Sequence, residues 1–162
     1  MRFIYISGPK IEGLLTYRDH EKSIDFEPQF EKFSPAKIGP TAALTVSQTL
    51  QLDVKLADGS ILYAWGYLPE ESWHKIDSEL VLPPSVAGRV LVTNAPEKPE
   101  EAMAYATSLD DDEPFYHTRS GHIVIGATKD LDQFIEIATN IYVGLKGGTL
   151  ACIVLRPVIV TH

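Results

Sequence analysis

The chain of 162 residues has the length of one ordinary domain, in which folding removes roughly 70% of the unfolded surface from water. A hydrophobic content of 44% excludes a disordered chain. The 22 acidic residues exceed the 14 basic ones, and the net charge of -8 argues against nucleic-acid binding, which relies on clustered Lys and Arg. We expect one folded domain over residues 1–162, whose acidity either favours solubility alone or attracts a basic protein partner.

A single cysteine, Cys152, cannot form an internal disulfide, which favours a reducing compartment. It lies in the apolar run 150–155, where a free cysteine is typically a small buried hydrophobe. The apolar residues before Gly8 are too few for a signal peptide, and no run reaches the ~20 residues of a membrane span. We therefore expect a cytoplasmic protein that makes no membrane contact.

The most regular stretch is 50–68, in which two alternating runs are joined by Asp58-Gly59. This dipeptide favours a two-residue type I′ turn and a β-hairpin that pairs Leu52 with Trp65 on one apolar face. The opposite face of the second run is also small or apolar, so something must cover it. The cover is segment 18–40, another strand or a second molecule; a second molecule, such as another copy in a homodimer, would place Leu62 and Leu68 in an interface.

Strands are predicted at 2–7, 11–17 and 41–56, the last with a bend near 47–49 because the polar Gln48 interrupts its apolar alternation. Segment 18–40 has no clear period but contains three prolines and three phenylalanines. We interpret it as an ordered cover, with a functional flap as the alternative. Pro69 predicts a short helix, and Pro83-Pro84 divides a strand-rich half, 1–82, from a second half, 85–162.

The second half predicts strands at 89–93 and 150–155, a hairpin at 115–127 around Ser120-Gly121, and helices at 99–109 and 130–146. The second helix is favoured by apolar residues spaced by three and four between Leu131 and Leu145, and Gly147-Gly148 would end it. The order βαββαβ resembles the ferredoxin-like arrangement. The predicted fold class is therefore α+β, an antiparallel-rich sheet with two main helices.

The densest polar cluster consists of an acidic run followed by the polar side chains of the predicted hairpin. It comprises Asp110, Asp111, Asp112, Glu113, His117, Arg119 and His122. The hairpin pairing predicts that Arg119 faces His122, with His117 on the same side. A solvated acidic loop, a metal site and a docking surface for a basic partner are the three interpretations. The spacing matches no metal motif, and Arg119 would repel a cation.

No other stretch carries catalytic or cofactor chemistry by motif. The 126–129 turn lacks a phosphate-binding pattern, and Ser120 near His122 lacks the GxSxG context of a nucleophile. We predict no catalytic residue, no cofactor and no metal. The first hypothesis is an acidic protein-binding module, such as an inhibitor or a toxin-neutralising, immunity-type protein. The alternative is a small enzyme or small-molecule-binding domain with a pocket between the sheet and segment 18–40.

Overall fold

The protein is almost entirely built of β-strands. The computed structural model describes residues 1–93 and 101–161, and strands account for 54% of the chain. Within these ranges the helical segments are two short 3₁₀ turns, η1 (Glu31–Phe33) and η2 (Glu70–Ser72). None of the described helical segments has the length and hydrophobicity needed to cross a membrane.

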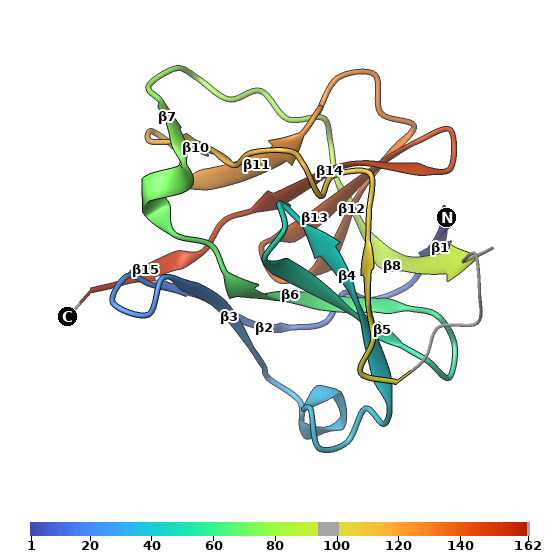
Figure 1. The fold of residues 1–162 in the computed structure, drawn as a ribbon. Coiled ribbons are helices and arrows are strands. Elements are labelled where there is room, and N and C mark those ends of the chain that lie inside the picture. Colours follow the sequence, from blue (N-terminus) through green and yellow to red (C-terminus); the bar gives the residue numbers. More distant parts are fainter. Residues whose placement is uncertain (94–100, 162) are drawn as a thin grey trace.

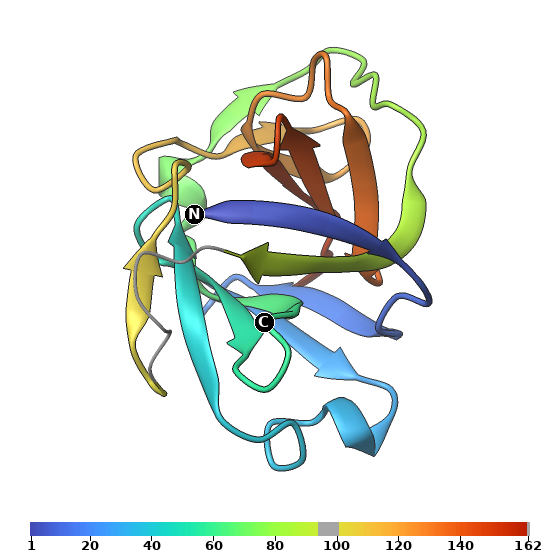
Figure 2. The same cartoon turned by 90° about the vertical axis from the view of Figure 1, so that its right-hand side faces the viewer.

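The strands form two sheets that face each other (Figures 1 and 2). The eight-stranded sheet has the order β1 (Arg2–Ser7), β8 (Val86–Thr93), β12 (Gln133–Ala138), β13 (Ile141–Lys146), β14 (Thr149–Leu155), β11 (His122–Gly126), β10 (Phe115–His117), β7 (His74–Ile76). The seven-stranded sheet has the order β15 (Val158–Val160), β2 (Gly13–Arg18), β3 (Ser23–Pro28), β6 (Ile61–Tyr67), β5 (Leu50–Lys55), β4 (Thr41–Val46), β9 (Ala104–Ala106). Both sheets contain strands from before and after Pro83-Pro84, so the two predicted halves are interleaved.

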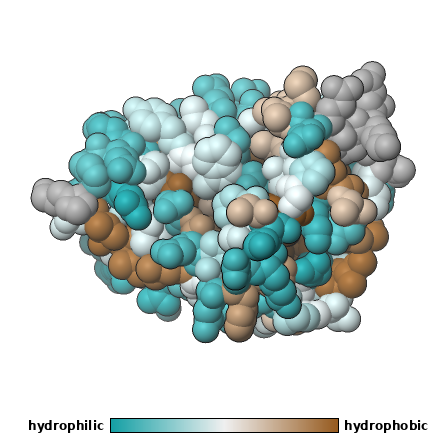
Figure 3. All heavy atoms as spheres, turned by 90° about the horizontal axis from the view of Figure 1, so that it is seen from below, coloured by the Kyte–Doolittle hydropathy of each residue, from teal (hydrophilic) through white to brown (hydrophobic). Residues whose placement is uncertain are grey.

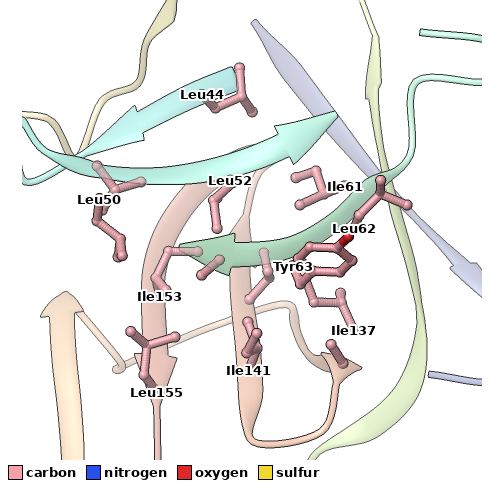
Figure 4. Close-up of a cluster of buried hydrophobic side chains, with 14 of the residues drawn as sticks. Leu44, Leu50, Leu52, Ile61, Leu62, Tyr63, Ile137, Ile141, Ile153 and Leu155 are labelled. Atoms are coloured by element: carbon pink, nitrogen blue, oxygen red, sulfur yellow. The ribbon is translucent and has the colours of Figure 1, made fainter. Parts of the chain in front are cut away.

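The core lies between the sheets, where apolar side chains from β5 and β6 meet those from β12, β13 and β14 (Figure 4). Leu52 and Ile61 come from the first group, and Ile141 and Ile153 from the second; each is at most 2% exposed. Burial of an aliphatic side chain of this size stabilises the fold by about 1.5–3 kcal/mol. The face of the molecule seen from below is mostly hydrophilic, with hydrophobic residues toward its left and right sides (Figure 3).

The predicted helix over 130–146 is wrong, because this segment forms the antiparallel hairpin β12–β13. Its apolar residues satisfy the helical spacing, but Ile135 and Ile137, and then Ile141 and Val143, also alternate as strand residues do. β-Branched side chains favour the extended backbone. Asn140, at φ 64°, reverses the chain between the two strands.

The predicted helix over 99–109 is also wrong where the structure describes it; residues 99 and 100 lie outside the described ranges. Ala102 has φ 63°, which a right-handed helix does not accommodate. The following residues form β9, which pairs in parallel with β4. The α+β class with two main helices and the ferredoxin-like order are therefore corrected to an all-β fold with two mixed sheets.

The predicted hairpin over 50–68 is present as β5–β6, but its register differs. Leu52 pairs with Ala64, and Gln51 pairs with Trp65. The tip is longer than two residues: the Lys55 N–H donates to the Ser60 carbonyl (2.9 Å), and Asp58 accepts from the Ser60 backbone. The shift places Trp65 on the outer face of the sheet, 41% exposed, where its indole N–H donates to Asp53 Oδ1 (2.7 Å).

The second strand of this hairpin is covered by the protein itself. Leu62 and Leu68 are each 1% exposed, so neither is accessible to a second molecule in this fold. Part of segment 18–40 is β3, which hydrogen-bonds to β6. The Tyr63 hydroxyl donates to the Phe33 carbonyl (2.9 Å) and so holds the loop that follows β3. Burial raises the pKa of Tyr63 to about 12.

Cys152 is fully buried on β14, as predicted. Burial raises the pKa of its thiol to about 12, against the opposing effect of a hydrogen bond with the Gly144 backbone. A thiol in this state is neutral at physiological pH, and the thiolate is the nucleophilic form. Cys152 is therefore a packing residue.

Substitutions of Asn140 distinguish the hairpin from a helix. At φ 64°, valine should lower the free energy of unfolding by about 1–2 kcal/mol because its branched side chain opposes this conformation, whereas glycine should be tolerated. In a helix the order would be reversed, since glycine is the poorer helix former. Urea unfolding of Asn140→Val and Asn140→Gly measures the difference. Greater destabilisation by glycine would contradict the hairpin.

Candidate functional site

An open groove of about 480 Å³ lies where three loops meet at one end of the structure. One loop, 47–49, joins β4 to β5. The second, 67–72, leaves the end of β6, and the third, 110–114, leads into β10. His74, the first residue of β7, completes the lining. The groove is therefore built from segments that are far apart in the sequence.

The 47–49 loop is a tight turn, with φ 51° at Ser47 and 68° at Gln48. Its position relative to the acidic loop is fixed by two hydrogen bonds. The Ser47 N–H donates to the Leu109 carbonyl (3.0 Å), and the Gln48 N–H donates to Asp110 Oδ1 (3.1 Å). The bend predicted from Gln48 is confirmed, although here the chain reverses completely rather than continuing as one strand.

The acidic loop is itself held by backbone turns and by a buried anchor. The Asp110 N–H donates to the Thr107 carbonyl and the Asp112 N–H to the Leu109 carbonyl, both at 3.1 Å. Leu109 is 4% exposed and packs in the core, while Asp111 and Asp112 are exposed. The fold thus buries the start of the loop and directs the carboxylates that follow it toward water.

The opposite wall is fixed by η2 and by aromatic contacts. The Glu70 N–H donates to the hydroxyl of Tyr17 (3.0 Å), whose ring packs on Trp73 at 4.7 Å between centroids. His74 contacts the Glu113 carboxylate and stacks on Phe115 at 4.9 Å. These contacts connect the acidic loop to β7 across the groove.

The groove is strongly acidic. The lining residues, all in the described parts 47–74 and 110–114, include five carboxylates and one histidine but no Lys or Arg. Lys22 lies against Glu71, and His74 against Glu113, so each of these two carboxylates has a cationic or titratable neighbour. Asp111 and Asp112 face solvent. The groove therefore offers negative charge to a visiting cationic group.

The structure divides the seven predicted site residues into two groups. Asp110, Asp111, Asp112 and Glu113 line the groove, whereas His117, Arg119 and His122 do not. The hairpin that carries the second group has a longer tip than predicted. His117 pairs with His122 across the strands, and Arg119 in the tip donates from Nε to Asp77 Oδ1 (3.1 Å).

The two histidines form a half-buried pair beside Arg156. Burial lowers the pKa of His122, and the charges of Arg156 and His117 lower it further. His122 Nδ1 lies 2.8 Å from Ser120 Oγ, and His117 Nδ1 is buried without a hydrogen-bond partner among the described residues. Across 1–93 and 101–161, no three His, Cys, Asp or Glu side chains are grouped so that they could hold a metal ion.

Reasoning from the sequence missed the walls facing the acidic loop, formed by residues 47–49, 67–72 and His74. Only Gln48 gave a signal, as a polar residue that interrupts an apolar alternation. Nothing in the local sequence indicates that Tyr67 and His74 lie beside residues more than 35 positions later. Comparison with protein-family models and with curated proteins finds no match for this chain.

The histidine pair predicts a pH dependence of stability. The pKa of His122 is lowered in the folded state from its ordinary 6.5. As the pH falls, the unfolded chain therefore binds more protons than the folded chain does. The stabilisation is complete above about pH 6.5 and is lost as the pH falls through the folded-state pKa. Urea unfolding between pH 8 and pH 5 should show a steeper decline for the wild type than for His122→Asn. Parallel curves would contradict this assignment.

Proposed function

We propose that the protein is an acidic binding module whose groove receives a basic segment of another protein. The observation that carries the proposal is the five-carboxylate lining of a groove that contains no lysine or arginine among its described residues. An inhibitor or toxin-neutralising, immunity-type protein would use such a surface to cover a basic partner. The net charge of -8 also attracts a positively charged partner at long range.

The rigid loops favour this function because they reduce the cost of binding. The backbone hydrogen bonds at Ser47 and Gln48 connect two walls of the groove before any partner arrives. Loops that are already ordered lose little conformational freedom on association. Their charges also speed diffusional encounter with an oppositely charged surface, and salt weakens this effect.

The groove also contains surface suited to the apolar part of a basic side chain. Tyr67 lines it and is 50% exposed. Phe115 lies outside the lining but stacks on the lining residue His74 and is 40% exposed. The methylene stem of Lys or Arg packs on such surface while its charged end meets carboxylates. An aromatic face next to a cation adds about 0.5–1 kcal/mol.

A second candidate function, small-molecule binding, is favoured by the groove's size. Its volume of about 480 Å³ falls in the range typical of ligand sites, roughly 300–1,000 Å³. We expected a pocket between the sheet and segment 18–40, but no residue of that segment lines this groove. Part of the segment, β3, is itself a strand of the sheet. A small cationic ligand would use the same carboxylates as a protein would. The test compares free arginine with an oligolysine peptide at equal total charge. If arginine raises the melting temperature as strongly as the peptide does, small-molecule binding is favoured.

Reversing the two exposed carboxylates tests the main proposal. Asp111→Lys combined with Asp112→Lys should slow association with an octalysine peptide by about tenfold at low ionic strength, because steering depends on local charge. The salt dependence of the association rate should become flatter. Stopped-flow measurements at several salt concentrations give both quantities.

The control for this experiment changes the net charge equally but elsewhere. Glu31→Lys combined with Glu79→Lys replaces two exposed carboxylates outside the groove lining. This variant should keep most of the association rate. Equal losses in the two variants would show that the peptide responds to net charge alone and would contradict a role for the groove.

A further inference from the structure

Among the residues that the structure describes, β9 is the last strand of the seven-stranded sheet, and no further strand pairs with its outer edge. On its inner side the Ala43 N–H donates to the Met103 carbonyl (2.9 Å), and the Thr107 N–H donates to the Thr45 carbonyl (3.2 Å). Backbone groups alternate in direction along a strand. The N–H and C=O groups of Ala104 and Ala106 therefore point away from β4, toward the outer edge of the sheet.

β9 is short, but its residues are not of the kinds that normally prevent another strand from pairing. Proteins protect edge strands with lysine, proline or bulges, none of which occurs in the three residues of β9. Ala104 and Ala106 are exposed, and their methyl groups leave the backbone accessible, whereas Tyr105 packs against the core cluster. Figure 2 shows β9, in yellow, at the margin of the sheet next to β4.

The charge next to β9 indicates what kind of segment could pair with it. The acidic run Asp110–Glu113 begins four residues after Ala106 and forms one wall of the groove. An extended chain rises about 3.3 Å per residue, so a strand paired with β9 would reach the acidic run within a few residues. Basic side chains on that strand would then lie close to Asp110 and Asp111.

We propose that β9 is the docking edge for an extended, Lys- or Arg-bearing segment of the partner, which adds to the seven-stranded sheet as a further strand. This inference rests on the proposed function and specifies how the basic segment binds. Main-chain hydrogen bonds to Ala104 and Ala106 hold the segment, and the acidic run selects its charge. Strand addition of this kind is a general mode of peptide recognition.

Amide hydrogen exchange tests the inference directly. The probe is a capped peptide of about ten residues in which Lys and Val alternate, a pattern that favours an extended conformation. Its binding should slow exchange of the Ala104 and Ala106 amides by about tenfold or more. The amide of Thr107 already donates to Thr45 and should change much less.

A proline variant supplies an independent test. Ala106→Pro removes an outward N–H without removing a hydrogen bond to β4, and proline is tolerated on edge strands in this orientation. We expect the peptide to bind at least about fivefold more weakly, the cost of a lost hydrogen bond plus the bulk of the ring. The matched control, Ala106→Ser, keeps the N–H and should bind like the wild type. Circular dichroism and the melting temperature verify folding.

The outcomes separate this inference from the proposed function. If Ala106→Pro binds as tightly as the wild type and the two alanine amides exchange at unchanged rates, strand addition is wrong, while a loss of binding in the Asp111/Asp112 variant would still support the groove. Peptide that fails to bind the wild type at low ionic strength would overturn both. If Ala106→Pro is unfolded, the exchange rates of the wild-type amides decide the result.

Discussion

Strand β6 is the element on which the rest of the structure depends. Its residues Ile61 to Ala64 are all buried, so both faces of the strand are covered. One face contributes to the core shared with the opposite sheet (Figure 4). β5 pairs with β6 between Ile61 and Gly66, and β3 pairs with its last two residues. A strand buried on both faces has a strongly specified register, because a one-residue slip would rearrange every contact. The rigid centre of the molecule follows from this constraint.

The groove is a consequence of the same arrangement. β5 begins just after the 47–49 turn, and β6 ends at Tyr67, so two walls of the groove emerge from paired strands. The third wall is connected to them through Leu109 and through the contact of Gln48 with Asp110. The fold therefore holds like charges close together at its surface. Such an arrangement costs stability, and a cationic partner would relieve it.

The sequence predicted much of the strand content but misjudged the second half. The β-branched runs at 89–93 and 150–155 and the turn signal at Asp58-Gly59 identified real strands and a real hairpin. The apolar residues in 130–146 fit both the spacing of a helix and the alternation of a strand. The helix was predicted, although the β-branched Ile135, Ile137 and Ile141 favour a strand. The acidic loop was found because its charge is local. Its facing walls depend on long-range pairing, which no local pattern specifies.

If the groove is the binding surface, a basic segment contacts the three loops that line it. An NMR titration of the isotope-labelled protein with the octalysine peptide tests it most directly, because amide shifts locate the contact without any substitution. We expect the largest shifts within 47–49, 67–74 and 104–114. Shifts concentrated on the β10–β11 hairpin tip, or spread evenly over the acidic surface, would contradict it.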